Sequence, residues 1–274
     1  MSAPRLGAEP SRLSRWLILG IVGVVFAIPI LSMVEFTLRA GLDGGYDFHH
    51  WTAILDPANK RKYAVLFQGV GNSLVLAVVT VAIVLVILLP TMILVTTSFP
   101  KLRRVLEFIC LIPITVPAIV LVVGLAPVYQ IVSRVFGSSP WTLAFAYGIT
   151  VLPYAYRAIA ANLAGVDVIT LGEAARSLGA GWGSVLFRVI LPNLRRGILA
   201  ASFISVAVVL GEFTIASLLN RNNLQTGVVQ IAKTDSFVAV IFSLLALAFG
   251  FLLLLLIGRI SRIGRRTSRK GTAS

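Results

Sequence analysis

The side chains that could bind a metal ion gather in one hydrophilic stretch of the N-terminal region. His49 and His50 are adjacent there, with Asp47 and Asp56 close by in the sequence, and imidazole and carboxylate groups are common zinc ligands. Adjacent residues, however, point in different directions on a helix, and the chain has no third histidine and only one cysteine. We therefore expect a solvated external loop here and no metal site.

Motifs for nucleotide hydrolysis and for hydrolytic membrane enzymes are absent from the sequence. A phosphate-binding P-loop needs a glycine followed directly by lysine, and no glycine in this chain has that neighbour. The HExxH pattern of zinc proteases and the GxSxG pattern of serine hydrolases are missing as well. We expect neither an enzymatic activity nor a cofactor in this chain.

Glu212 is the one acidic residue that falls well inside an apolar segment. An acidic side chain at the centre of a membrane span costs about 2.5 to 3.5 kcal/mol on insertion scales. We therefore expect its carboxylate to face a water-filled cavity or a partner, which makes Glu212 the candidate residue of a translocation pathway. The alternative is a structural carboxylate, bonded to a neighbouring hydroxyl group or to a helix end.

The composition excludes a water-soluble domain of ordinary type. The chain has 274 residues, of which 58% are hydrophobic and 12% charged, and its formal net charge is +14. In a soluble protein such a charge would suggest nucleic acid, but the basic residues here flank apolar runs and do not interleave with aromatic side chains. Membrane orientation explains them better, so we expect no nucleic-acid partner and a chain embedded in the lipid bilayer.

Six apolar segments are long enough to cross a hydrocarbon core of about 30 Å. They cover approximately residues 16–34, 70–95, 108–128, 141–161, 198–219 and 237–257. With the N-terminus inside, 17 of the 24 lysines and arginines fall on the cytoplasmic side, as the positive-inside rule requires. We therefore expect an all-α integral membrane protein with six transmembrane helices, both termini in the cytoplasm, and a cytoplasmic loop between spans four and five.

That cytoplasmic loop contains two short amphipathic helices joined at glycine. Thr170 and Glu173 have the spacing of a capping box, which would begin the first helix. Gly179 stands where a left-handed residue is favoured at a helix C-terminus. The second helix would start at Trp182, and Pro192 would end it by restraining the residue before it. The pattern predicts a helix, a glycine turn and a helix that are offered to a partner.

Eight residues of this loop also follow a known pattern: Glu173, Ala174 and Ala175, then Gly179, then Val189, Ile190, Leu191 and Pro192. This pattern resembles the EAA loop of bacterial binding-protein-dependent ABC importer permeases, which normally have isoleucine at the position of Val189. The resemblance implies a coupling helix that docks into a groove on a separate cytoplasmic ATPase. The alternative is an ordinary amphipathic loop on the membrane surface.

A shorter match at Gly211, Glu212 and Phe213 resembles the fifth span of permeases from the polyamine, ferric iron, phosphonate and thiamine branch. The resemblance implies two permease subunits, homologous or identical, that form the pathway, two cytoplasmic ATPase subunits that hold the ATP, and an extracytoplasmic solute-binding protein. It implies a multi-pass protein of the bacterial cytoplasmic (inner) membrane. That protein would import a small polar or charged solute, such as a polyamine, by alternating access.

The resemblance implies a permease domain over residues 70–257, with the coupling loop at 165–197. A cytoplasmic leader, 1–15, and the first span with its external loop, 16–69, precede this domain, and a basic cytoplasmic tail, 258–274, follows it. Two rival classes stay open. An ion-coupled secondary transporter would need coupling-ion sites at mid-membrane, and a membrane scaffold would transport nothing.

Overall fold

A computed structural model describes residues 11–40 and 44–268 of the chain, and every regular element in those ranges is a helix. Twelve α-helices are described: α1 Arg12–Leu38, α2 His49–Ala53, α3 Ala64–Thr97, α4 Arg103–Leu111, α5 Ala118–Phe136, α6 Ala144–Leu163, α7 Val168–Ser177, α8 Trp182–Ser184, α9 Leu191–Gly211, α10 Thr214–Leu218, α11 Leu224–Ala232 and α12 Ser236–Ser268. The all-α prediction is confirmed for these ranges. Most of the predicted leader and the end of the predicted tail lie outside them.

Five of the described helical stretches are long and apolar enough to cross a membrane. A sixth is added if Pro140–Leu163 and Val168–Ser177, which meet at a bend of 63°, are counted as one broken span. Predicted spans one, two, four and six each fall within one of these stretches. The chain is therefore a multi-pass membrane protein, and its hydrophobic pattern was sufficient to locate four of the six expected spans.

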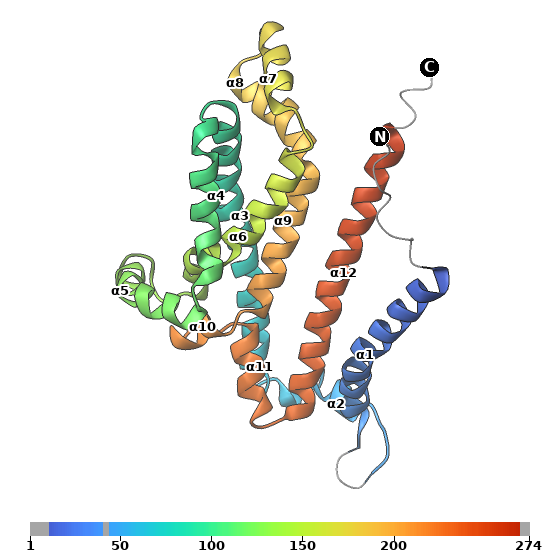
Figure 1. The fold of residues 1–274 in the computed structure, drawn as a ribbon. Coiled ribbons are helices and arrows are strands. Elements are labelled where there is room, and N and C mark those ends of the chain that lie inside the picture. The colour runs from blue at the N-terminus through green and yellow to red at the C-terminus, as the bar shows by residue number, and fades with distance from the viewer. Residues whose placement is uncertain (1–10, 41–43, 269–274) are drawn as a thin grey trace.

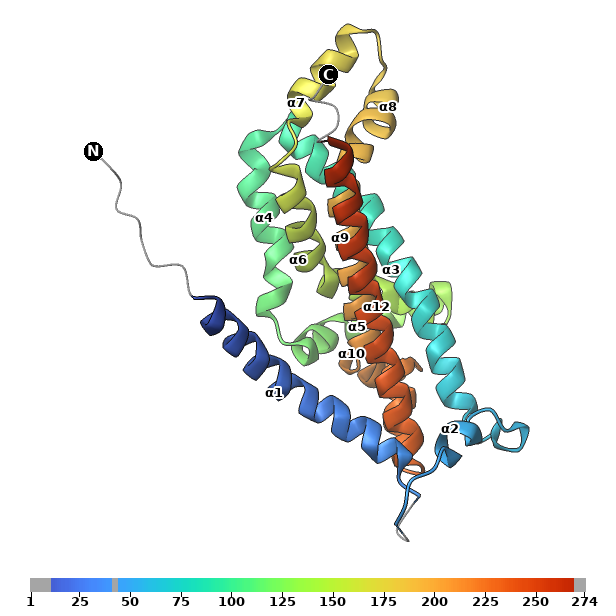
Figure 2. The same cartoon turned by 90° about the vertical axis from the view of Figure 1, so that its right-hand side faces the viewer.

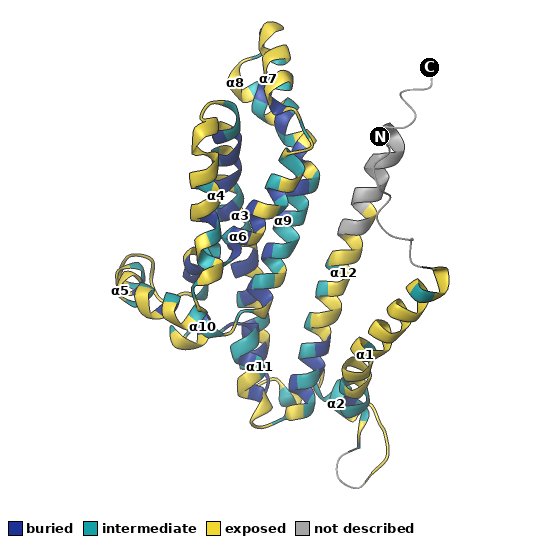
Figure 3. Ribbon diagram, viewed as in Figure 1, coloured by how far each residue is buried: buried dark blue, intermediate teal, exposed yellow. Residues whose placement is uncertain are grey.

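The core lies where α3, α6 and α9 pack together, and α6 has its most extensive contact with α9. Buried residues line the facing sides of these three helices, whereas α1 is exposed along most of its length (Figure 3). Gly197 of α9 permits the close approach to α6, because a Cβ atom there would lie 2.7 Å from the Cβ of Asn162. The Gly197 backbone N–H donates to the Asn162 side-chain oxygen at 3.0 Å, which satisfies a polar group between two helices.

The prediction of a single third span over residues 108–128 is wrong. Helix α4 ends at Leu111, a 3₁₀ turn covers Ile112–Thr115, and α5 begins only at Ala118. Pro117 excludes helical geometry at the residue before it, and Val116 is extended, with φ −98° and ψ 120°. After this break α5 lies crosswise to α3 and α4 (Figures 1 and 2). The predicted span therefore joins parts of two helices that run in different directions.

The prediction of a fifth span over residues 198–219 is wrong at its C-terminal end, because the helix stops at Gly211. The helical stretch begins at Trp182 and continues without interruption to Gly211. Residues Val185–Ile190 form a π-helix, and Pro192 lies in the first turn of α9. Pro192 follows shortly after this π-helical segment and does not end the helix as we expected. The stretch ends instead at Glu212, whose backbone is extended.

Helix α1 stands apart from the core and slants toward the N-terminal end of α12 (Figure 2). The contact is aromatic: the Phe237 ring stacks on Phe36 at 4.7 Å and on His50 at 3.9 Å between ring centroids. The Nε2 atom of His50 lies 3.1 Å from the Arg39 carbonyl oxygen. In the described structure His50 thus serves to pack the external loop against α12.

Candidate coupling loop and translocation residues

Helices α7 and α8 project from one end of the bundle, beyond the ends of α3, α4 and α6 (Figure 1). The C-terminal end of α12 points toward the same end of the molecule, whereas α11 lies at the opposite end. The loop is therefore presented at a tip, where a partner could reach it without entering the bundle.

The first helix of the loop is capped by Asp167, so the predicted capping box at Thr170 and Glu173 is wrong. The Asp167 carboxylate accepts hydrogen bonds from the Thr170 hydroxyl group at 2.7 Å and from the Thr170 backbone N–H at 3.1 Å. These two bonds, the one from the hydroxyl group first, lower the pKa of the Asp167 carboxyl group below its usual value. Asp167 is a favoured N-cap residue and lies three residues before Thr170, our predicted N-cap, so that α7 begins at Val168.

Gly179 has the left-handed conformation that the sequence predicts, with φ +83°. Its N–H donates to the Arg176 carbonyl at 2.9 Å, and the N–H of Ala180 donates to the Ala175 carbonyl at 3.0 Å. This pair of bonds is the Schellman motif, which satisfies carbonyl groups at the end of a helix. The glycine turn between the two short helices is therefore confirmed.

The loop has one packed side and one open side. Val168 and Val185 are buried, and Ala175 is half-buried. Glu173 and Ala174 are exposed, and Leu178 is 89% exposed. Trp182 and Phe187 are also exposed apolar side chains. Exposed apolar side chains of this kind are typical of a surface that binds another protein or a membrane.

The second half of the resembling pattern leads directly into α9. Val189 and Leu191 are half-buried, and Pro192 is exposed. The Asn193 side chain donates to the Val189 carbonyl oxygen at 2.7 Å, next to the π-helical segment. Because the helix is continuous from Trp182 to Gly211, the loop is joined directly to the bundle core.

Glu212 lies at the break between α9 and α10, not in the middle of a helical span. Its two carboxylate oxygens lie 2.9 and 3.1 Å from the backbone nitrogen of Ile215, so the side chain caps α10. The Glu212 carbonyl oxygen accepts a hydrogen bond from the Asn223 side chain at 2.7 Å. This arrangement matches the structural alternative, a carboxylate bonded to a helix end.

Asn223 organises the end of the bundle opposite the projecting loop, and our sequence analysis missed it. The residue is 0% exposed, and its side-chain nitrogen also lies 3.1 Å from the Tyr147 hydroxyl oxygen on α6. With Thr226 it forms a capping box at the start of α11. The spacing of Asn223 and Thr226 was therefore a signal in the sequence, but its contacts with Glu212 and Tyr147 depend on tertiary structure.

A cleft of about 750 Å³ lies between α9 and α12, and residues of α6 and α11 contribute to its walls. The side chains that line it are mostly apolar, and Gln225 and Ser243 are among the few polar ones. Gly211 lines this cleft, whereas the neighbouring Glu212 does not. In the described structure Glu212 therefore does not line this cleft.

Several known proteins are similar in sequence to this chain. Residues 93–263 match the family model described as binding-protein-dependent transport system inner membrane component. The molybdenum transport system permease proteins ModB of Mycobacterium tuberculosis and Mycobacterium bovis are 28% identical to this chain, over 94% of its length and 98% of theirs. ModB of Escherichia coli K12 is 34% identical over 44% of this chain and 56% of its own length.

A probable ABC transporter permease protein, y4fN of Sinorhizobium fredii, is 27% identical over 89% of this chain. The chain spans only 45% of the length of that relative. The family model alone covers more than half of this chain, and its residues include α7, the glycine turn and α9. The chain therefore belongs to the inner membrane components of binding-protein-dependent transport systems and is a permease subunit of an ABC importer.

Proposed function

We propose that this chain forms one half of a membrane pathway through which an ATP-driven importer moves a small polar or charged solute by alternating access. A second permease subunit, homologous or identical, supplies the other half, and an extracytoplasmic binding protein delivers the solute. Two separate cytoplasmic ATPase subunits bind and hydrolyse the ATP. Both termini and residues 165–197 lie in the cytoplasm in this arrangement, which the distribution of lysine and arginine supports.

The single observation that carries the proposal is the projecting helix, glycine turn and helix at the tip of a permease fold. We assign ATPase coupling to seven of the eight residues that follow the pattern, namely Glu173, Ala174, Ala175, Gly179, Val189, Leu191 and Pro192. Leu178 and Trp182 would enter the groove of the ATPase, because they are the exposed apolar side chains at the tip. The continuous helix from Trp182 to Gly211 would then carry motion of the ATPase into the bundle.

For the solute we propose a small oxyanion. Two relatives that match over almost their whole length are named for molybdenum transport, and molybdenum in neutral water is a tetrahedral oxyanion. The relatives named here give no support to a polyamine. In the described structure the Glu212 carboxylate caps α10, so it is bonded to a helix end and not to a cation.

The test is copurification followed by transport. We expect the tagged chain, extracted from its native membrane, to bring an ATPase with it, and the complex in proteoliposomes to take up molybdate only with ATP and a binding protein. Excess putrescine should leave this uptake unchanged, whereas excess tungstate should compete with it. Uptake driven by an ion gradient without an ATPase would indicate a secondary transporter, and neither activity would indicate a scaffold.

A pathway role for Glu212 stays a prediction, and two substitutions separate it from the capping role. We expect Glu212→Gln to keep uptake within about twofold of wild type, because a glutamine oxygen can accept the same bond from Ile215. Glu212→Leu removes the cap and should lower the free energy of unfolding by about 1 kcal/mol. Slow uptake by a normally folded Glu212→Gln complex, with a smaller dependence on salt, would instead support the pathway role.

A further inference from the structure

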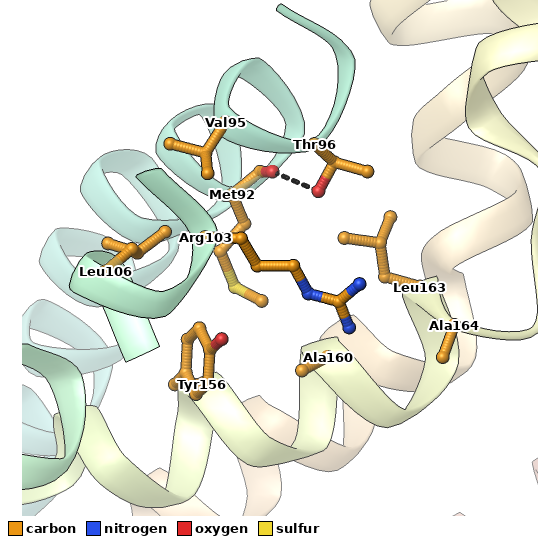
Figure 4. Close-up of a pocket in the computed structure, with 9 residues that line it drawn as sticks. All are labelled: Met92, Val95, Thr96, Arg103, Leu106, Tyr156, Ala160, Leu163 and Ala164. Carbon is orange, nitrogen blue, oxygen red and sulfur yellow. Dashed lines mark hydrogen bonds between the residues drawn. The ribbon is translucent and has the colours of Figure 1, made fainter. Parts of the chain in front are cut away.

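A small cavity lies at the end of the bundle that carries the coupling loop, where the C-terminal ends of α3 and α6 meet the N-terminal end of α4 (Figure 4). Its volume is about 50 Å³. Met92, Leu106 and Leu163 make most of its wall apolar, and Arg103 and Tyr156 bring polar groups to it. The proposed import function uses none of these residues.

Arg103 brings a positive charge to this cavity. It is the first residue of α4, and its guanidinium group extends over the cavity toward Leu163 and Ala164 (Figure 4). Within the described ranges the group makes no hydrogen bond and no ion pair, although Glu107 lies one helical turn further along α4. A guanidinium group has five N–H donors in a planar arrangement that suits phosphate or carboxylate oxygens.

Tyr156 supplies a second, independent observation. The residue is only 5% exposed, and its hydroxyl group has no hydrogen-bond partner among residues 11–40 and 44–268, while the residue lines the cavity. The hydroxyl oxygen is not among the buried polar atoms that lack a partner, so it is accessible from the cavity. The Tyr156 hydroxyl is therefore available to donate to an acceptor that lies beside Arg103.

The backbone of α4 favours the same kind of ligand. No side chain caps this nine-residue helix at its start, where Leu102 is the N-cap residue. The Arg103 N–H donates to the Pro100 carbonyl of the preceding 3₁₀ turn, and the helix dipole gives this end a partial positive charge. A water molecule needs about 10 to 15 Å³ of cavity volume. The cavity, at about 50 Å³, therefore has room for roughly four oxygen atoms. The charge, the donors and the size fit one tetrahedral anionic group.

We propose that the cavity binds a phosphate group, held by the Arg103 guanidinium and the Tyr156 hydroxyl group. The apolar wall and the position at the end of membrane-spanning helices fit the headgroup of an anionic phospholipid, and free phosphate has the same chemistry. A bound phosphate would link the ends of α3, α4 and α6 directly beside the start of α7. The site is separate from the solute pathway, so its test measures binding and not transport.

The test is a titration of the full chain in a neutral detergent, with melting temperature as the readout and phosphatidylglycerol or inorganic phosphate as the added ligand. We expect the added ligand to raise the melting temperature of the wild type. Arg103→Gln should weaken the apparent affinity about tenfold or more, because hydrogen bonds to a charged group contribute that much. Tyr156→Phe, which removes only the hydroxyl oxygen, should weaken it several-fold.

Arg104→Gln is the matched control, because Arg104 is also an exposed arginine in the first turn of α4 but does not line the cavity. This variant should bind as the wild type does. A response to the lipid alone identifies a headgroup site, and a response to both ligands shows that the phosphate group suffices. The proposal is overturned if neither ligand raises the wild-type melting temperature, or if Arg103→Gln binds no more weakly than Arg104→Gln.

Discussion

Gly179→Val is expected to give a stable membrane protein that binds its ATPase at least tenfold more weakly and transports correspondingly little. Gly179 has φ +83°, where a residue with a side chain costs about 1 to 2 kcal/mol and a β-branched one more. No atom lies within 4 Å of the position of a Cβ there, so the strain is confined to the backbone. Relief of that strain requires the turn to open, which displaces α8 relative to α7.

Gly183→Val is the matched control for that prediction. Gly183 belongs to the same loop, has no positive φ, and has equally open space around its Cβ position. The measurement is ATPase binding to the purified permease, followed by ATP-dependent uptake in proteoliposomes. Equal defects in the two variants would mean that the added side chain blocks the docking surface, and the turn geometry would then not be the cause.

Gly69→Ala is expected to lower the free energy of unfolding by about 1 to 3 kcal/mol and the melting temperature by about 5 °C. A Cβ atom at Gly69 would lie 2.5 Å from the Asn223 carbonyl oxygen and 2.9 Å from its carbon. This backbone cannot shift easily, because the Asn223 side chain is bonded to Glu212 and Tyr147 and the next N–H, of Leu224, donates to Ser73.

Gly71→Ala tests whether the effect is specific to that contact. Gly71 lies two residues further along α3 and has no atom within 4 Å of its Cβ position. Alanine there should leave the melting temperature unchanged or raise it, since glycine is unfavourable inside a helix by about 0.5 to 1 kcal/mol. Thermal unfolding of both variants in the same detergent is the measurement. If Gly69→Ala and Gly71→Ala have the same melting temperature, the close contact between Gly69 and the Asn223 backbone contributes little to stability.

Local sequence patterns were enough to predict the helix, glycine turn and helix between residues 168 and 190. The apolar runs around it mark membrane spans on either side, and the turn at Gly179 follows from what one residue's backbone permits. The predicted start of the first loop helix was three residues late because Asp167 competes with Thr170 as the N-cap, and both are good caps by sequence. The break before α5 also has a local cause, in Pro113 and Pro117, although we expected one continuous span there.

The sequence by itself determined that this chain is helical, crosses a membrane several times, and carries a helix, glycine turn and helix between two spans. These properties depend on hydropathy and on backbone preferences within a few residues. Only the tertiary structure decided that Glu212 caps α10, that Asn223 joins α9, α6 and α11, and that Arg103 and Tyr156 meet at one cavity. Arg103 and Tyr156 are far apart in the sequence, and the packing of one helix on another, which no local pattern encodes, brings them together.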